Sequence, residues 1–162
     1  MALVFLAAAV AGAAPKATPT PRPPLDFSGT WELDEKASVN VSANMKGAVL
    51  SVTQKGNRIW ISPVKKEEGP RQPILAEEIV VDGQPYEKTL GPAGTGLVTA
   101  GWAPDGKSLR IEVQAGAAES RGSAVQRSVW KVSEDHTVWV RESTSFSSGR
   151  AARARLVFRK RK

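Results

Sequence analysis

Cysteine is absent from the 162 residues, and histidine and tyrosine each occur once. Without cysteine the chain has no disulfide bond, no thiolate metal site, no catalytic thiol and no acylated N-terminal cysteine. A metal site built on histidine needs ligands from several positions, whereas His136 lies alone in the turn-like stretch SEDHT. We therefore expect His136 to be an exposed turn residue, and we predict neither a metal site nor a cofactor.

Recognisable catalytic motifs are also missing. Glu67-Glu68 and Glu77-Glu78 are adjacent pairs whose members point to opposite faces of an extended strand, so we expect solvated charges rather than shared acid–base work. The glycine-rich stretch GPAGTGLV lacks the helix that must follow a phosphate-binding loop. The sequence therefore predicts a protein that is not an enzyme and names no catalytic residue.

No run of about 20 apolar residues occurs, so we expect no transmembrane anchor. The stretch MALVFLAAAVAGAA, residues 1–14, carries no charged side chain and ends in small residues with an Ala11-Gly12-Ala13 cleavage pattern. It is typical of a secretory signal peptide, although no Lys or Arg precedes the apolar run. We expect export to the periplasm or the extracellular space.

Prolines are concentrated in residues 15–24, PKATPTPRPP. Proline fixes φ and removes a hydrogen-bond donor, so this stretch is expected to be an extended linker. The chain's 41% hydrophobic and 24% charged residues are ordinary for a globular protein. We expect one folded domain over residues 25–162.

Residues 25–162 lack a sustained i, i+3, i+4 apolar pattern, so helix is expected only as a turn or two within residues 35–47. Strand-like segments recur instead between turn signals, and their connections are too short for parallel crossovers. ILAEEIVV and PYEKTL are expected to form a hairpin around Asp82-Gly83-Gln84. The expected strands are GTWEL, VLSVTQ, RIWISPV, ILAEEIVV, PYEKTL, GLVTAGWA, SLRIEVQA, SAVQRSVWKV, TVWVRESTSF and ARARLVFRK. An antiparallel meander of this length tends to close into a barrel.

The opening of the expected domain, DFSGTWELDEKAS, contains Gly29-Thr30-Trp31 and resembles the Gly-x-Trp signature of lipocalins and other calycins, which include fatty-acid-binding proteins. It is similar, more specifically, to small exported bacterial lipocalin-like proteins that open with F-S-G-T-W-x-L. LSVTQKGNRIWI, VVDGQPYEKT and SVWKVSEDHTVWVRESTS resemble their later hairpins. The resemblance implies an all-β, antiparallel up-and-down, lipocalin-like or fatty-acid-binding-protein-like barrel of roughly eight to ten strands with little helix.

The same resemblance assigns roles at one end of the barrel. Gly29 lets the first strand bend, Trp31 plugs the end, and Arg153 or Arg155 of the last strand packs across the indole. The last strand reads Arg155-Leu156-Val157-Phe158 and lacks the Arg-x-Tyr pair with which fatty-acid-binding proteins hold a carboxylate. Residues 35–47 do not resemble their two-helix lid.

Tryptophans and arginines inside the expected strands are candidates for a ligand site. If they face inward together, they form an apolar pocket with a cationic anchor for an amphipathic anion. The alternative is that the tryptophans pack in the core and the arginines lie on the surface. Trp130 and Arg110 belong to the same pattern, and the candidate ligand-binding residues are Trp60, Trp102, Arg127, Trp139 and Arg141.

The net charge of +7 is concentrated at one place. Residues 150–162 hold seven basic residues and no acidic one, and the other 16 basic residues balance the 16 acidic ones. By alternation, Arg153, Arg155, Arg159 and Arg161 share a face and form a candidate basic patch. They either pair with acids of neighbouring strands or bind an anionic partner, which for an exported protein is lipid headgroups, cell-wall polymers or acidic proteins rather than nucleic acid.

Two functional hypotheses follow. The resemblance implies an exported binding protein for a small lipophilic or amphipathic ligand, without catalysis. The alternative is an interaction protein with a filled barrel, whose basic C-terminal strand contacts an anionic envelope component or a protein partner.

Overall fold

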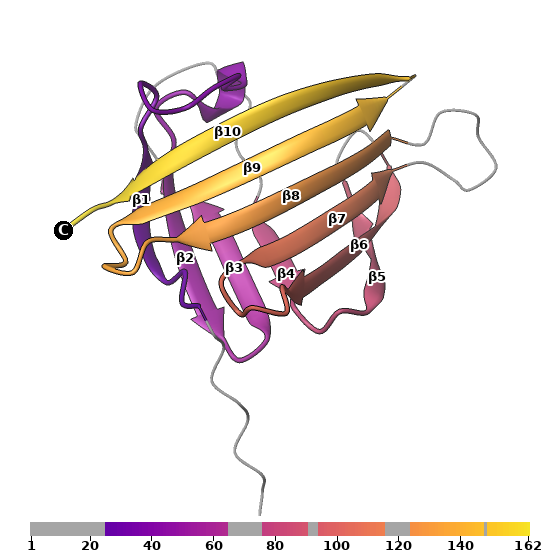
Figure 1. Cartoon of the computed structure of the whole chain (residues 1–162), viewed down its shortest axis with the longest axis horizontal. Helices are drawn as coiled ribbons and strands as arrows, with labels where there is room; N and C mark the ends of the chain where they lie inside the picture. The colour runs from indigo at the N-terminus through magenta and orange to yellow at the C-terminus, as the bar shows by residue number, and fades with distance from the viewer. Residues whose placement is uncertain (1–24, 65–75, 91–93, 116–123, 148) are drawn as a thin grey trace, which may run out of the picture.

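A computed structural model of the chain describes residues 25–64, 76–90, 94–115, 124–147 and 149–162 (Figure 1). The expected signal peptide and proline-rich linker lie outside these residues. Within the described part, ten β-strands and one short 3-10 helix are found. They are β1 (Gly29–Leu33), η1 (Ala43–Met45), β2 (Val49–Lys55), β3 (Arg58–Pro63), β4 (Glu77–Val80), β5 (Pro85–Thr89), β6 (Thr95–Trp102), β7 (Leu109–Ala115), β8 (Ala124–Val132), β9 (Val138–Ser147) and β10 (Arg150–Lys160).

The strands form one antiparallel sheet in the order β4-β3-β2-β1-β10-β9-β8-β7-β6-β5. Strands that follow one another in the sequence are neighbours in the sheet, with the exception of β4 and β5. In addition, the first strand, β1, pairs with the last, β10. The sheet curls so that β6 to β10 lie in front of β1 to β4 in Figure 1. The expected all-β, up-and-down barrel-like fold is therefore confirmed.

The hairpin expected between β4 and β5 is wrong, because these strands are the two edges of the sheet. The turn between them is held by the next strand along: the backbone N–H of Gly83 donates to the carbonyl of Ala100 in β6, at 2.8 Å. Pro85, the first residue of β5, pairs with Thr99 of β6. The turn thus directs β5 onto β6 rather than back onto β4.

Side chains bridge the resulting seam between β4 and β5. The Tyr86 hydroxyl accepts a hydrogen bond from the backbone N–H of Val80, at 3.3 Å. The Lys88 ammonium donates to the Glu77 carboxylate at 3.1 Å and to the Glu78 carbonyl at 2.9 Å. Polar side chains therefore stand where a backbone ladder would otherwise join the two edges.

The connection between β1 and β2 contains little helix, as expected. Only Ala43–Met45 form a single 3-10 turn. Val39 instead makes an antiparallel bridge with Arg155. The backbone N–H of Val39 donates to the carbonyl of Arg155 at 2.7 Å, and the N–H of Arg155 donates to the carbonyl of Val39 at 3.0 Å. Residues of this connection therefore run beside β10 as an extended segment, which suits a β-branched valine.

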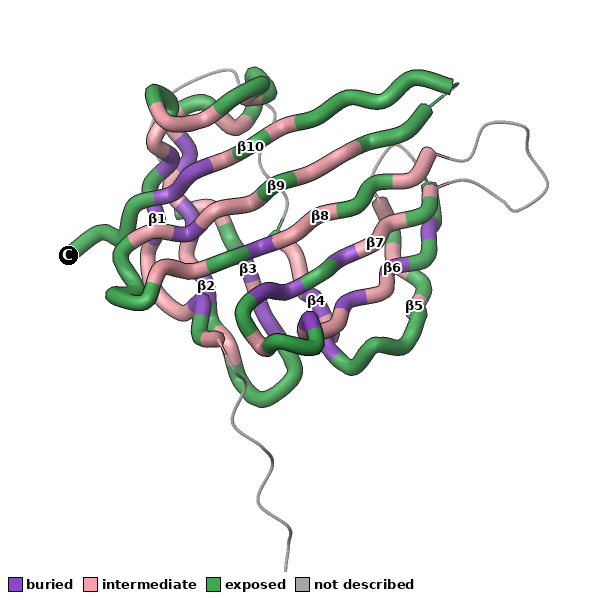
Figure 2. The backbone as a smooth tube through the Cα atoms, in the orientation of Figure 1, coloured by how far each residue is buried: buried purple, intermediate pink, exposed green. Residues whose placement is uncertain are grey.

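Inward-facing side chains of alternate positions form the core, which gathers toward one end of the sheet (Figure 2). We call the end at which β8 ends and β9 begins the turn end, and the opposite end, at which β9 ends and β10 begins, the loop end. Trp130 and Trp139 are fully buried near the turn end, whereas the last residues of β9 and the first of β10 are exposed. The molecule is packed at one end and open to solvent along the inner face of β8 to β10 at the other.

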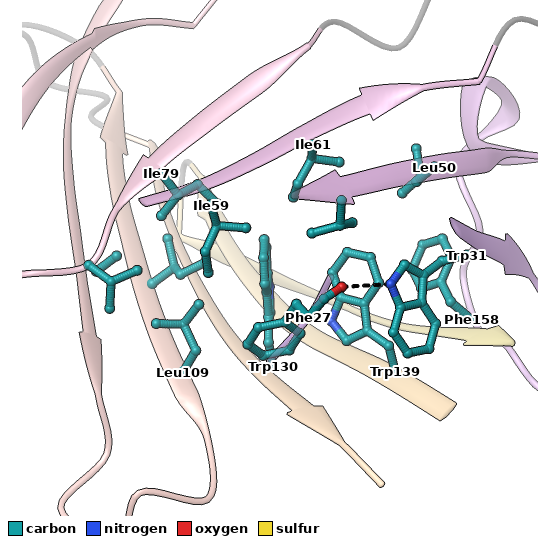
Figure 3. Close-up of a cluster of buried hydrophobic side chains, with 14 of the residues drawn as sticks. Phe27, Trp31, Leu50, Ile59, Ile61, Ile79, Leu109, Trp130, Trp139 and Phe158 are labelled. Carbon is teal, nitrogen blue, oxygen red and sulfur yellow. Dashed lines mark hydrogen bonds between the residues drawn. The ribbon is translucent and has the colours of Figure 1, made fainter. Parts of the chain in front are cut away.

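Phe27, which precedes β1, completes the core from the turn end (Figure 3). Its ring centroid lies 5.9 Å from those of Trp130 and Trp139, in edge-to-face contacts. The Trp31 indole N–H donates to the Phe27 carbonyl at 2.8 Å. The opening stretch of the domain thereby plugs the barrel with two aromatic rings rather than with Trp31 alone.

The cation that covers Trp31 is Lys160, whose ammonium lies 5.4 Å from the ring centroid. The expectation that Arg153 or Arg155 takes this place is not met, because β10 pairs with β1 so that Lys160 lies opposite Trp31. Arg155 lies five residues earlier, where its guanidinium donates to the carbonyl of Ala37 at 3.0 Å. The cation–π contact is kept, with a different residue in it.

Gly29 is required by both its backbone angle and its surroundings. Its φ is +139°, and a Cβ placed there would lie 2.6 Å from the Lys160 side chain. We expect Gly29→Ala to lower the free energy of unfolding by about 1–3 kcal/mol, because alanine is strained at this angle and Lys160 must leave Trp31. Urea unfolding followed by tryptophan fluorescence measures the change.

The matched control is Gly56→Ala, since Gly56 also has a positive φ, of +58°, but has no heavy atom within 4 Å of the added methyl. It measures the strain of alanine at a left-handed backbone angle with no side chain displaced, about 1–2 kcal/mol. Equal losses in the two variants would show that the contact with Lys160 has no energetic role.

Tyr86, at the seam between β4 and β5, titrates differently in the folded and unfolded protein. Burial raises the pKa of the Tyr86 phenol above its ordinary value of 10.0, while the hydrogen bond from Val80 opposes the rise. The folded state therefore favours the protonated phenol, so the stability that Tyr86 contributes is present below pH 10 and is lost as the pH rises through the higher, folded pKa. Tyr86 is the chain's only tyrosine, so phenolate absorbance reads this group alone. We expect its midpoint to lie higher in the folded protein than in urea, and identical midpoints would contradict the burial.

Candidate functional site

The inner face of β8, β9 and β10 changes character between the two ends. Near the turn end it carries the buried Trp130, Trp139 and Phe158. Toward the loop end its inward positions are small or polar, and they form two cross-strand rows: Ser128, Ser143 and Ala154, then Gln126, Ser145 and Ala152. All three residues of the second row are exposed although they share the inward parity of the tryptophans. This half of the inner face is therefore accessible to solvent.

Arg141 lies at the boundary between the two halves. It pairs with Trp130 in β8, one row before Ser143. Its guanidinium carbon lies 4.3 Å from the centroid of the Trp130 ring and 5.5 Å from that of Trp139. Both distances are within the range of cation–π attraction, so the aromatic floor of the site holds the cation.

The charge on Arg141 is not neutralised by a close carboxylate. Among the described residues its guanidinium makes no ion pair and no side-chain hydrogen bond. Burial lowers the pKa of Arg141, and the negative charge of Glu77 partly offsets this. Arginine stays protonated in proteins and has five N–H groups. The inner face therefore presents a cation with hydrogen-bond donors to spare.

Glu77 belongs to the inner face of β4, where it pairs with Ile61. Its carboxylate binds the Lys88 ammonium of the seam, 3.1 Å away, and so acts on Arg141 only at longer range. Two cations and one anion therefore occupy this part of the interior. Their net charge of one positive unit favours a ligand that carries one negative charge.

The aromatic floor adds two more unsatisfied donors. The indole N–H groups of Trp130 and Trp139 are buried and have no hydrogen-bond partner, whereas that of Trp31 is bonded to Phe27. The rings of Trp130 and Trp139 meet edge to face, with centroids 5.2 Å apart. Buried donors without acceptors are uncommon and costly. The floor beside Arg141 therefore holds two further donors without an acceptor among the described residues.

Three of the five residues proposed from the sequence for an interior site face inward. Trp139 and Arg141 lie at the site itself. Trp102 also faces inward and stacks on Phe27, with ring centroids 6.3 Å apart and an angle of 5° between the ring planes. It therefore belongs to the apolar floor rather than to the accessible half.

Trp60 and Arg127 lie on the outer face and do not join this site, contrary to the sequence-based expectation. Trp60 stands between the inward-facing, buried Ile59 and Ile61, so strand alternation turns it outward. Arg127 is exposed and pairs with Glu112 across β8 and β7, at 2.9 Å. Neither side chain can reach a ligand inside the barrel.

Trp130 and Glu77 are functional candidates that the sequence-based set omits. Trp130 is two residues from Ser128 in β8, so the same alternation that makes Ser128 inward makes Trp130 inward. Glu77 was expected to be a solvated charge, as was Glu78. Alternation does separate them, since Glu78 binds Arg58 on the outer face at 2.6 Å while Glu77 faces inward. The inward member of the acidic pair carries the electrostatic role.

A groove of about 360 Å³ lies on the outer face of β6, β7 and β8. Two cross-strand rows of outward residues line it: Gly101, Arg110 and Val129, and Thr99, Glu112 and Arg127. Gly101 has no side chain and leaves room between its neighbours. Trp102, Ile111 and Ser128, which alternate with these residues, also border the groove, whereas Arg141 does not line it.

The candidate basic patch divides in two. Three of its arginines pair with acidic residues in β9, in β1 or just after β1: Arg155 with Glu142 at 3.8 Å, Arg159 with Asp34 at 3.1 Å and Arg161 with Glu32 at 3.5 Å. Arg153 makes no ion pair with a described residue. The patch expected on one face is therefore largely neutralised toward the C-terminus and uncompensated toward the start of β10.

No group of three or more metal-binding side chains is gathered in the described part of the chain. His136 lies exposed in the turn between β8 and β9. In the same part of the chain, no helix is long and apolar enough to cross a membrane.

No protein-family model and no curated protein sequence matches the chain. Among solved structures, the chain is similar to zebrafish ileal bile acid-binding protein complexed with cholic acid. The two share 12% sequence identity, with a TM-score of 0.50 over 83% of this chain and 98% of that one. Together with the strand order, this likeness shows that the chain has a calycin-like fold, a ten-stranded antiparallel meander of the kind seen in bile-acid-binding protein.

Proposed function

We propose that the protein binds a small amphipathic molecule with one negative charge on the inner face of its barrel, and that it is not an enzyme. The observation that carries this proposal is Arg141, a partly buried guanidinium held on two tryptophan rings without a close carboxylate. An anionic oxygen beside it would gain charge-assisted hydrogen bonds.

The surroundings of Arg141 set the rest of the ligand's chemistry. From Arg141 toward the loop end, the inward side chains include the hydroxyls of Ser128 and Ser143 and the apolar Leu156 and Val113. A molecule whose body has both apolar and hydrogen-bonding faces matches this wall. The bile-acid-binding neighbour holds cholic acid, which is likewise a small amphipathic molecule, and supports the ligand class while its low identity leaves the ligand itself open.

The alternative of a filled barrel that acts through its basic strand is less well supported. Arg155, Arg159 and Arg161 are already paired within the molecule. The inner face, by contrast, has exposed inward residues at Gln126 and Ser145, which a filled barrel would cover. Interior binding is therefore the function that the geometry favours.

The test compares cholate and dodecanoate with dodecanol, which has the same tail as dodecanoate but no charge. Arg141→Met removes the guanidinium and keeps an apolar side chain, and it should weaken binding of the two anions by roughly 10- to 150-fold, the value of a hydrogen-bonded charge. Binding of dodecanol should change little. Tryptophan fluorescence and calorimetry measure the affinities.

Arg127→Met is the matched control, because it removes the same group from the outer face. It should leave all three affinities unchanged. Equal loss in both arginine variants would mean that general charge attraction explains the binding. Failure of the wild-type protein to bind either anion would overturn the proposal for this ligand class.

We also propose that the protein acts after export, on the evidence of the uncharged apolar stretch in residues 1–14. Expressed with its full N-terminus, the protein should be recovered outside the cytoplasm with an intact mass that begins at Ala14 or Pro15. Ala13→Asp should block cleavage, because the processing site needs small residues. A cytoplasmic product that retains residues 1–14 would contradict export.

A further inference from the structure

The tip of the β9–β10 hairpin has a charge pattern unlike the rest of β10. The segment STSFSSGRAARA, residues 143–154, contains Arg150 and Arg153 but no acidic residue. Both arginines are exposed, and neither makes an ion pair with a described residue. Their positive charge is therefore available to a partner, in contrast to the paired arginines farther along the strand.

An exposed aromatic side chain lies beside these charges. Phe146 of β9 is 41% exposed and pairs with Ala151 of β10, which is also exposed. The guanidinium carbon of Arg127 in β8 lies 5.9 Å from the Phe146 ring centroid. Two outward acids border these residues, and each is bound to an arginine: Glu112 to Arg127 at 2.9 Å and Glu142 to Arg155 at 3.8 Å. We call Phe146, Ala151, Arg150, Arg153 and Arg127 the tip patch.

The register places the patch at the rim of the loop end. Phe146, Ala151 and Arg153 share the outward parity, and Arg150 has the inward parity beside Ser147. Arginines therefore flank the aromatic ring on both faces of the hairpin. The hairpin extends away from the packed core, as Figures 1 and 2 show.

We propose that the tip patch docks on an anionic phospholipid surface, with the loop end of the barrel turned toward the bilayer. Guanidinium groups bind phosphate oxygens through paired hydrogen bonds, and an exposed phenylalanine partitions into the interface below the headgroups. The absence of acidic residues from the hairpin tip removes the repulsion that a negative surface would otherwise exert. The inference concerns the outer rim and does not depend on a ligand in the interior.

The size of the patch favours a membrane over a protein partner. A stable protein interface covers roughly 800 Å² on each partner, with several large side chains at its centre. The tip patch offers one large apolar side chain, Phe146, with cations around it. A fluid lipid surface requires no shape complementarity, so one aromatic anchor and two or three arginines are sufficient.

The test is flotation of the purified protein with phosphatidylcholine vesicles, with and without phosphatidylglycerol. Arg150→Gln/Arg153→Gln should weaken partitioning onto the phosphatidylglycerol vesicles about 25-fold, which is about fivefold for each arginine. Phe146→Ser should weaken it further without changing its dependence on salt. Because all three residues are exposed, an unchanged melting temperature confirms that the variants fold.

The matched control is Arg159→Gln/Arg161→Gln, which removes the same charge at the C-terminal end of β10 and just beyond it, from arginines bound to Asp34 and Glu32. This variant should weaken partitioning onto the phosphatidylglycerol vesicles less than fivefold. Equal losses in the two double variants would show that net charge alone drives binding, and would overturn the proposal that the tip patch is the docking site. Equal binding to the two vesicle types, or capture by polyglutamate but not by vesicles, would overturn the proposed lipid partner.

Discussion

The pairing of β1 with β10 is the contact on which the rest of the structure depends. It joins residues more than 120 positions apart, such as Trp31 and Lys160. Through this pairing Trp31 receives its cation from Lys160. It also brings β1 beside the hairpin of β9 and β10, where Trp31 meets Trp139 edge to face, with ring centroids 5.8 Å apart. The aromatic floor that β8 and β9 supply under Arg141 is therefore covered by Phe27 and Trp31 only when the first and last strands have paired. Contacts of such separation slow folding, because the chain must close a long loop before any of them forms.

The interior shows two opposing demands on one surface. Packing of indoles and aliphatic side chains stabilises the turn end, whereas a guanidinium and two indole N–H groups without acceptors destabilise it. Cation–π attraction to Trp130 and Trp139 recovers part of the cost of burying Arg141. A core selected for stability alone would replace Arg141 with an apolar residue. Its presence is the reason to assign the interior a binding role.

Much of the fold could be predicted from strand periodicity and turn residues, since each of the ten strands begins and ends near a visible turn signal. Which strands pair with one another was harder to predict. Asp82-Gly83-Gln84 marks a turn but does not say whether the chain returns onto β4 or proceeds to β6. Likewise, alternation shows that Trp60 opposes Ile59, yet only the curl of the sheet decides which face is interior. Lys160 replaced Arg155 over Trp31 because register is set by pairing between distant strands.

The side chains that bridge β4 and β5 also bear on how copies of the protein behave toward one another. Each of these strands presents backbone groups along an edge, and such edges recruit strands from other molecules. The ammonium of Lys88 stands in this gap and already binds groups of both β4 residues, Glu77 and Glu78, while Pro85 has no N–H to offer an incoming strand. These features are ones that disfavour the addition of a strand from another molecule at the open seam.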